Sequence, residues 1–203
     1  KLGTYNLHGS LLPKYRGAAP INWAVINGDS ETGVTSFKLK HQIDTGDYLF
    51  QEKLPIGPHE TAGEVYEKLR FIGAEVILDT VKAIESGEFE LTQQDESKVS
   101  KAPKIYHETC KINWNNNVDE VYNFIRGMSP YPTAWTTLDG LQFNIIQCKF
   151  VTESHHKEPG RIGYPDKKTM RIAAIGGYIL PTFIQLQGKK RMKIEDFLNG
   201  YLN

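Results

Sequence analysis

The sequence has few cysteines, no excess of either charge and no long apolar run. Its two cysteines, Cys110 and Cys148, lie far apart without the spacing of metal ligands, so we expect buried free thiols and neither a disulfide nor a zinc site. Lys and Arg together number 24, as do Asp and Glu, so any contact with nucleic acid must depend on a local patch. No apolar run approaches the roughly 20 residues of a membrane span, and no segment resembles a signal peptide. We therefore expect a cytoplasmic protein without a membrane partner.

The chain has 203 residues, of which 39% are hydrophobic, enough for one substantial domain or two small ones. It opens directly into a strand-like run at residues 2–7, with no initiator methionine and no preceding helix. We expect this sequence to be the C-terminal part of a longer protein. A short apolar strand that leads into a glycine-containing loop also predicts a parallel sheet with earlier strands as neighbours.

The pattern of residues 8–91 alternates loops, strands and helices. A loop at residues 8–17 precedes a short helix at residues 18–26, and two strands follow at residues 33–39 and 48–54 across a tight turn at residues 44–47. Thr61 and Glu64 predict a capping box for a long amphipathic helix that ends at Gly87. The sequence therefore predicts an α/β domain over residues 1–91.

The second half of the chain has a different pattern. Residues 92–106 are polar and aperiodic, which predicts a linker. Asn117 and Glu120 then cap a short helix that ends at Gly127. Strand-like segments follow with turn residues between them, at residues 135–138, 143–151, 169–175 and 178–186. Short strands at close spacing predict a small β-barrel domain over residues 107–203.

Asn6, His8 and Asp44 form a candidate catalytic group. Residues two apart in a strand face the same side, so Asn6 and His8 can point into one cleft at the strand's C-terminal end. His8 is suited to proton transfer, Asn6 can donate a hydrogen bond to an oxyanion, and Asp44 can orient His8 or relay protons. This set suits acyl transfer to an amine. By themselves the residues also fit a loop histidine and two turn formers.

Two motifs carry a resemblance to a known family. Residues 8–21 (HGSLLPKYRGAAPI) are very similar to the signature of the folate-dependent formyltransferases, and residues 44–47 (DTGD) resemble the family's folate-loop motif. The resemblance implies catalytic roles for Asn6, His8 and Asp44. It implies that residues 1–91 are the C-terminal portion of a doubly wound, Rossmann-like catalytic domain, followed by a small OB-like β-barrel. The residues implied to contact 10-formyltetrahydrofolate are Ser10, Leu11, Leu12 and Pro13.

The second half of the chain indicates the acceptor. Residues 125–135, 186–192 and 196–200 resemble the C-terminal domain of methionyl-tRNA formyltransferases. The resemblance implies transfer of the formyl group of 10-formyltetrahydrofolate to the α-amino group of methionyl-initiator tRNA, for translation initiation. It implies a monomer whose partners are this tRNA and the folate, and no metal.

Positive charge concentrates in the last quarter of the chain. The nine basic residues of this region are Lys157, Arg161, Lys167, Lys168, Arg171, Lys189, Lys190, Arg191 and Lys193. We expect a patch that contacts tRNA phosphates without reading bases; a solvated face is the alternative. The residues assigned to this patch are Lys167, Lys168, Arg171, Lys189, Lys190 and Arg191.

The remaining histidines are expected to have no chemical role. His155 and His156 are adjacent, so their side chains point apart on an extended chain, and no nearby carboxylate or cysteine completes a metal site. We expect them in a solvated loop, and His41, His59 and His107 on the surface.

Two other functions fit part of the sequence. An amino-sugar formyltransferase would use the same folate chemistry on a nucleotide sugar and would have no affinity for tRNA. A non-catalytic RNA-binding module would need only a small β-barrel with a basic face. That second alternative leaves Asn6, His8 and Asp44 unexplained.

Overall fold

The computed structural model describes residues 2–201, and the chain divides into two compact units. Unit 1 holds the residues up to 25 together with residues 29–105. Unit 2 holds residues 26–28 together with the residues from 106 onward. No helix within the described residues is long and apolar enough to cross a membrane.

Unit 1 combines a small sheet with one long helix. Its elements in chain order are β1 (Tyr5–His8), β2 (Arg16–Gly17), α1 (Pro20–Ile26), β3 (Glu31–Lys38), β4 (Tyr48–Pro55), α2 (Ala62–Ser86), the 3-10 helix η1 (Glu96–Lys98) and β5 (Lys101–Ala102). The predicted capping box is confirmed, because Thr61 and Glu64 each bind the other's backbone N–H at the start of α2. Gly87 ends α2 in the left-handed conformation, with φ of 72°.

The sheet of unit 1 has the order β1-β3-β4, and both of its pairings are antiparallel. The sequence predicts parallel pairing of the first strand with earlier strands, and the pairing of β1 with the later strand β3 leaves that prediction untested. The only helix between β1 and β3 is the seven-residue α1. A parallel return needs a crossover connection, usually an α-helix packed on the sheet, whereas here β3 runs back beside β1 in the opposite direction.

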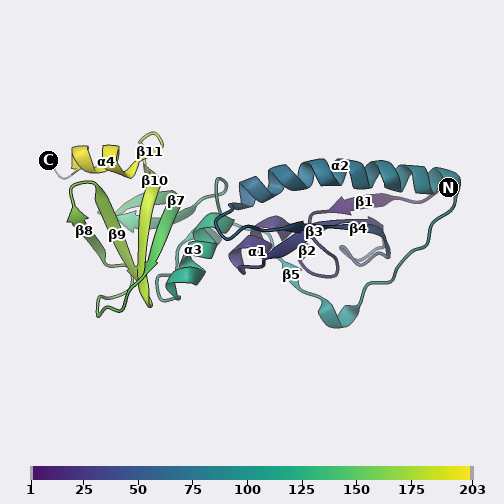
Figure 1. The fold of residues 1–203 in the computed structure, drawn as a ribbon, viewed down its shortest axis with the longest axis horizontal. Helices are drawn as coiled ribbons and strands as arrows, with labels where there is room; N and C mark the ends of the chain where they lie inside the picture. Colours follow the sequence, from purple (N-terminus) through teal and green to yellow (C-terminus); the bar gives the residue numbers. More distant parts are fainter. Residues whose placement is uncertain (1, 202–203) are drawn as a thin grey trace. The chain divides into compact units, whose positions relative to one another are not determined.

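Helix α2 lies along one face of this sheet (Figure 1). Its buried stripe includes Gly73, where a Cβ atom would come within 2.8 Å of the Leu7 side chain. Thr80 of α2 donates a hydrogen bond to the Ser36 hydroxyl of β3 at 2.8 Å. Leu7 and Ser36 are paired across β1 and β3, so α2 covers the face that both residues share.

Residues 92–105, where the sequence predicts a linker, are packed into unit 1. Thr92 and Tyr48 exchange two backbone hydrogen bonds of 2.9 Å. Strand β5 pairs in parallel with β2, and the Ser100 hydroxyl accepts a hydrogen bond from the Tyr15 backbone at 2.9 Å. The segment lacks apolar periodicity because backbone and side-chain hydrogen bonds, not an apolar face, attach it to the unit.

Unit 2 is mainly β-structure. Its elements are the 3-10 helix η2 (Glu108–Cys110), α3 (Val118–Gly127), β6 (Ala134–Leu138), β7 (Leu141–Thr152), β8 (Ile162–Asp166), β9 (Thr169–Ala174), β10 (Gly177–Leu186), β11 (Met192–Lys193) and α4 (Ile194–Tyr201). The predicted helix and the four predicted strands are confirmed as α3, β6, β7, β9 and β10. Strands β8 and β11 and helix α4 were not predicted.

The strands of unit 2 form one antiparallel sheet with the order β6-β7-β10-β9-β8, and β11 pairs with β10. Within residues 2–201, no pairing joins β6 to β8. Phe143 of β7 is fully buried and contacts Phe197 of α4, with ring centroids 5.6 Å apart. The sheet and α4 therefore share one core.

The cysteines and the surface histidines lie close to their expected positions. Both cysteines are free; Cys110 is buried, and Cys148 is half-buried instead of fully buried. Burial raises the pKa of the Cys148 thiol. The prediction for His41, His59 and His107 is confirmed, since all three are exposed.

Candidate active site

Asn6 and His8 lie on the face of β1 that α2 leaves uncovered. Asn6 is paired with Phe37 and His8 with Thr35, whereas Leu7 between them points toward α2. The prediction that Asn6 and His8 share one face is confirmed. Asn6 is exposed, while His8 is buried with 6% of its surface accessible.

The two ring nitrogens of His8 have different partners. Nε2 lies 2.8 Å from the backbone oxygen of Tyr15, and Nδ1 lies 3.7 Å from Oδ2 of Asp44. A carbonyl oxygen can only accept, so Nε2 carries the proton in this contact. In the neutral ring, Nδ1 therefore holds the lone pair and faces the carboxylate of Asp44.

Asp44 is held in a tight turn by its backbone and by its side chain. Its φ of 55° is left-handed, a conformation that aspartate tolerates better than most residues. Its Oδ2 atom accepts a hydrogen bond of 2.9 Å from the backbone N–H of Gly17. The same oxygen thus faces both the Gly17 amide and the His8 ring, which fixes the carboxylate beside Nδ1.

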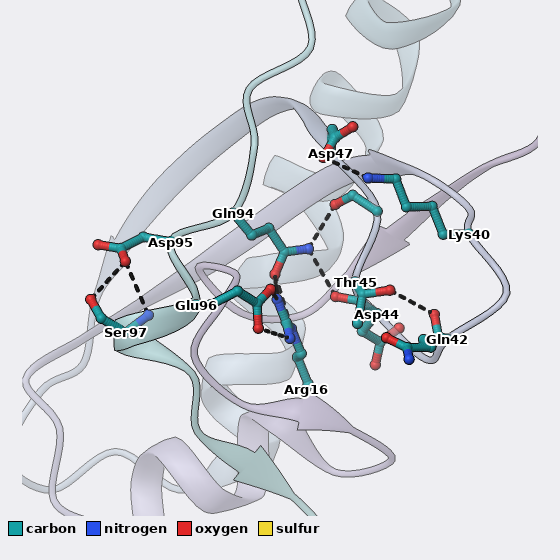
Figure 2. Close-up of polar contacts among 11 residues, drawn as sticks. Arg16, Lys40, Gln42, Asp44, Thr45, Asp47, Gln94, Asp95, Glu96 and Ser97 are labelled. Atoms are coloured by element: carbon teal, nitrogen blue, oxygen red, sulfur yellow. Dashed lines mark hydrogen bonds and ion pairs between the residues drawn. The ribbon is translucent and has the colours of Figure 1, made fainter.

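Gln94, which sequence reasoning missed, lies in the segment predicted to be a linker and holds the Asp44 turn by hydrogen bonds (Figure 2). Gln94 is 4% exposed. Its side-chain nitrogen donates to the backbone oxygens of Asp44 at 2.8 Å and of Gly46 at 2.7 Å. Its Oε1 atom accepts from Nε and Nη2 of Arg16 at 3.0 and 2.7 Å. The amide therefore uses both donors and its acceptor to join three segments.

Arg16 extends this network to Glu96. The guanidinium donates two hydrogen bonds to the Glu96 carboxylate, at 2.7 and 3.1 Å (Figure 2). These hydrogen bonds hold the pKa of the Glu96 carboxyl below its usual value. Arg16 belongs to the motif at residues 8–21, but its partners lie about 80 residues away in sequence. Spacing within the motif could not have identified them.

The loop assigned to folate contact is fixed by the adjoining strands. The Thr35 hydroxyl donates to the backbone oxygen of Ser10 at 2.6 Å and accepts from the backbone N–H of Leu12 at 3.0 Å. Gln51 donates to the backbone oxygen of Leu12 at 2.7 Å. Ser10, Leu12 and Pro13 are buried, while Leu11 is half-buried. The structure thus holds the backbone of the loop and leaves Leu11 the most accessible of the four.

A pocket of about 510 Å³ lies beside this loop in unit 1. Its lining includes Leu11, Leu12 and Pro13, together with Tyr48 and Gln51. Asn6, His8 and Asp44 do not line it. The pocket by itself therefore does not place a ligand beside His8.

The six residues assigned to tRNA contact lie at three places in unit 2. Lys167 and Lys168 occupy the turn between β8 and β9, and residues 189–191 occupy the turn between β10 and β11. These five are exposed, whereas Arg171 of β9 is half-buried. Within residues 2–201, none of the six forms an ion pair with a carboxylate.

Two family models and a set of curated relatives match this chain. Residues 1–81 match the model described as formyl transferase, and residues 104–202 match the model of the formyl transferase C-terminal domain. The chain belongs to the formyl transferase family. It is 47% identical, over 99% of its own length, to the methionyl-tRNA formyltransferase of Phocaeicola vulgatus. It spans 65% of the length of that relative.

Solved structures share the mixed α/β formyltransferase fold. HypX from Aquifex aeolicus, in complex with tetrahydrofolic acid, aligns with a TM-score of 0.74 at 19% identity, over 98% of this chain and 35% of that chain. An N-formyltransferase from Helicobacter canadensis, in complex with folinic acid and dTDP-3-aminofucose, aligns with a TM-score of 0.70 at 23% identity, over 87% of this chain and 65% of that chain. At these identities the likeness shows the fold alone.

We expect Gln94→Ala to lower the free energy of unfolding of this formyl transferase by about 1–3 kcal/mol, because the buried oxygens of Asp44 and Gly46 lose their donor. Urea unfolding followed by circular dichroism measures the change. Gln93→Ala is the matched control, since Gln93 is an exposed neighbour with no recorded hydrogen bond within residues 2–201. Equal stabilities of the two variants would show that the Gln94 contacts do not hold the turn.

Proposed function

We propose that the protein to which this chain belongs transfers the formyl group of 10-formyltetrahydrofolate to the α-amino group of methionyl-initiator tRNA. The observation that carries the proposal is the 45–47% identity, over nearly the whole chain, to proteins named methionyl-tRNA formyltransferase. The folate donor is supported by the family and by the tetrahydrofolic acid bound to the HypX neighbour. The chain spans 65% of such a relative, so the proposal concerns the whole protein.

In this proposal His8 accepts the proton of the amine. The methionyl amine attacks the formyl carbon, a C–N bond forms, and the amine must lose a proton. Nδ1 of His8 receives that proton, because Nε2 already donates to the Tyr15 oxygen. The Asp44 carboxylate lies 3.7 Å from Nδ1 and attracts the charged ring that results. The proton then passes to the folate nitrogen as its bond to the formyl carbon breaks.

In this proposal Asn6 stabilises the oxyanion. Attack on the formyl group gives a tetrahedral intermediate whose oxygen is negative, and an amide N–H is a suitable donor to it. Asn6 shares the open face of β1 with His8 and is exposed. One strand therefore presents the proton acceptor and the oxyanion donor side by side. In this proposal the loop of Ser10, Leu11, Leu12 and Pro13 contacts the folate.

The proposal assigns a role to each half of the chain. Residues 1–91 are the C-terminal part of a doubly wound catalytic domain, and residues 92–106, which pack into unit 1 up to residue 105, lead to an OB-like β-barrel at residues 107–203 that binds tRNA. The match of the C-terminal domain model to residues 104–202 and the antiparallel sheet of unit 2 support the second assignment. Its exposed cations on the two turns support the tRNA contact.

An amino-sugar N-formyltransferase is the second candidate, because the Helicobacter canadensis neighbour binds dTDP-3-aminofucose on a similar fold. The acceptor assay separates the candidates. The whole protein is incubated with 10-formyltetrahydrofolate and either methionyl-initiator tRNA or a dTDP-linked amino sugar. We expect formylation of the tRNA alone. Formylation of the sugar instead of the tRNA would refute the proposal and identify an amino-sugar formyltransferase. Formylation of neither acceptor would favour an RNA-binding module without catalytic activity.

We expect His8→Ala and Asp44→Ala to abolish measurable formyl transfer in the whole protein while tRNA binding stays nearly intact. Asn6→Ala should lose about 2.7–4 kcal/mol of transition-state stabilisation, or roughly 100- to 1,000-fold in turnover, if it serves the oxyanion. Steady-state kinetics with methionyl-initiator tRNA measure these losses. His41→Ala is the control, because His41 is exposed near the same turn. Near-normal turnover in any of the three variants removes that residue from the catalytic group.

We expect the triple change of Lys189, Lys190 and Arg191 to glutamine to weaken tRNA binding and to reduce its salt dependence. Each lost phosphate contact should shrink the slope of log affinity against log salt by about 0.7–0.9. The matched control changes Lys53, Lys68 and Lys82 of unit 1, which already pair with acidic neighbours. Turnover at saturating tRNA should survive. A slope equal to that of the control would make these residues an ordinary surface.

A further inference from the structure

Unit 2 contains a small cavity whose lining is strongly basic. Its volume is about 240 Å³, below the range usual for drug-sized ligands, so it suits a small group. It lies where β8, β9 and the start of β10 meet the segment that precedes β8. The lining residues are Lys157, Arg161, Ile162, Gly163, Arg171 and Tyr178.

The three cations of this cavity have no acidic partner. Lys157, Arg161 and Arg171 form no ion pair with any carboxylate of the described chain. Glu158 lies between two of them in sequence, but only its backbone oxygen is engaged, as the acceptor of the Arg161 backbone N–H at 3.0 Å. Three like charges around one cavity repel each other, and a bound anion would relieve that repulsion.

Arg171 is held with its donors available. Its guanidinium lies over the ring of Tyr178, 4.5 Å from the centroid, and stacking leaves the N–H groups at the rim of its plane free to bind an anion. Gly163 is paired with Arg171 across β8 and β9. A Cβ atom at Gly163 would lie 3.7 Å from Nε of Arg171, which is an ordinary van der Waals contact, so this position lines the cavity directly beside the guanidinium.

Tyr178 and Lys157 are both positioned by His155. The His155 and Tyr178 rings lie 4.3 Å apart. Nε2 of His155 lies 3.0 and 2.9 Å from the backbone oxygens of Ala174 and Gly177, and Nδ1 accepts from the backbone N–H of Lys157 at 3.1 Å. His155 is therefore half-buried and fully bonded, not solvated as the sequence suggested. It fixes the backbone that carries Lys157.

The hydroxyl of Tyr178 supplies a further donor. Tyr178 is only 4% exposed, and within residues 2–201 its hydroxyl is not among the buried side-chain atoms that lack a hydrogen-bond partner. A phenol that lines a basic cavity can donate its hydroxyl proton to an anionic oxygen. One face of the ring is already covered by Arg171, so the cavity offers no free aromatic surface for a base to stack on from that side.

We propose that Lys157, Arg161, Arg171 and Tyr178 form a pocket that binds a phosphodiester group of the RNA acceptor, independently of base identity. Lysine, arginine and tyrosine are the side chains that commonly contact RNA and DNA phosphates. This inference rests on the proposed function for the identity of its ligand. It goes further in assigning a phosphate contact to this cavity, where Arg171 is stacked on Tyr178, whereas the lysines at residues 167–168 and 189–190 are exposed on turns.

The test measures binding of methionyl-initiator tRNA to the whole protein by filter binding at several KCl concentrations. We expect Arg171→Gln to weaken binding about tenfold, because it removes a charged hydrogen-bond donor. The separate double variant Lys157→Gln with Arg161→Gln should also weaken binding about tenfold, for the same reason. An unrelated RNA of equal length should lose affinity by the same factor. Tyr178→Phe, which keeps the ring, should show a smaller loss. Arg70→Gln is the control, since Arg70 is exposed and paired with Glu67.

Each other outcome overturns part of the inference in a recognisable way. Unchanged affinity in the Lys157 and Arg161 double variant, whose two altered side chains are exposed and outside the core, would refute the pocket even if Arg171→Gln failed to fold. Competition by millimolar inorganic phosphate, with tRNA affinity unaffected by the variants, would assign the pocket to a free phosphate. Loss of RNA affinity in a protein that formylates no tRNA would keep the pocket and refute the proposed function.

Discussion

Helix α2 covers one face of the β1-β3-β4 sheet, and the candidate active site depends on the face that it leaves open. Leu7, Val34 and Ser36 face α2, so the alternation of the strands turns Asn6, His8 and Thr35 to the other side. Thr35 then binds the loop after β1, and that loop returns the Tyr15 oxygen to Nε2 of His8. The packing of α2 on one face of the sheet thus determines that, on the other face, Nε2 of His8 is bonded and Nδ1 is the nitrogen left to accept a proton.

The catalytic group could be predicted only in part from the sequence. The common face of Asn6 and His8 follows from the two-residue period of a strand. The approach of Asp44 to His8 depended on a resemblance, because nothing local relates a turn at residue 44 to a strand at residue 8. Gln94 could not be predicted, since its role is set by hydrogen bonds to residues about 50 and 80 positions away. Hydrogen bonds to such distant residues produce no periodic sequence pattern in a polar segment.

The same distinction, between local sequence signals and contacts between distant residues, explains which parts of the fold could be predicted. Helix α2 was predictable because its caps and apolar stripe are local features. The antiparallel order of β1 and β3 depends instead on how the chain returns, and a strand-like run carries no mark of its neighbour's direction. Strand β8 was missed because its mostly exposed residues include Gly163 and Pro165, which weaken any strand pattern. Local signals therefore identified most elements, whereas their pairing required the structure.

The zero net charge of the chain changes how its interaction with RNA must be explained. A chain without net charge has no long-range field to attract a polyanion. Its affinity for RNA therefore depends on two conditions: the cations must lie close together, and they must not be paired with carboxylates of the same protein. Exposed lysines on turns meet the second condition but lose side-chain entropy when they bind. Arg171, stacked on Tyr178, has lost part of that freedom on folding. His155, whose ring lies 4.3 Å from that of Tyr178, can in this way contribute to the recognition of a phosphate.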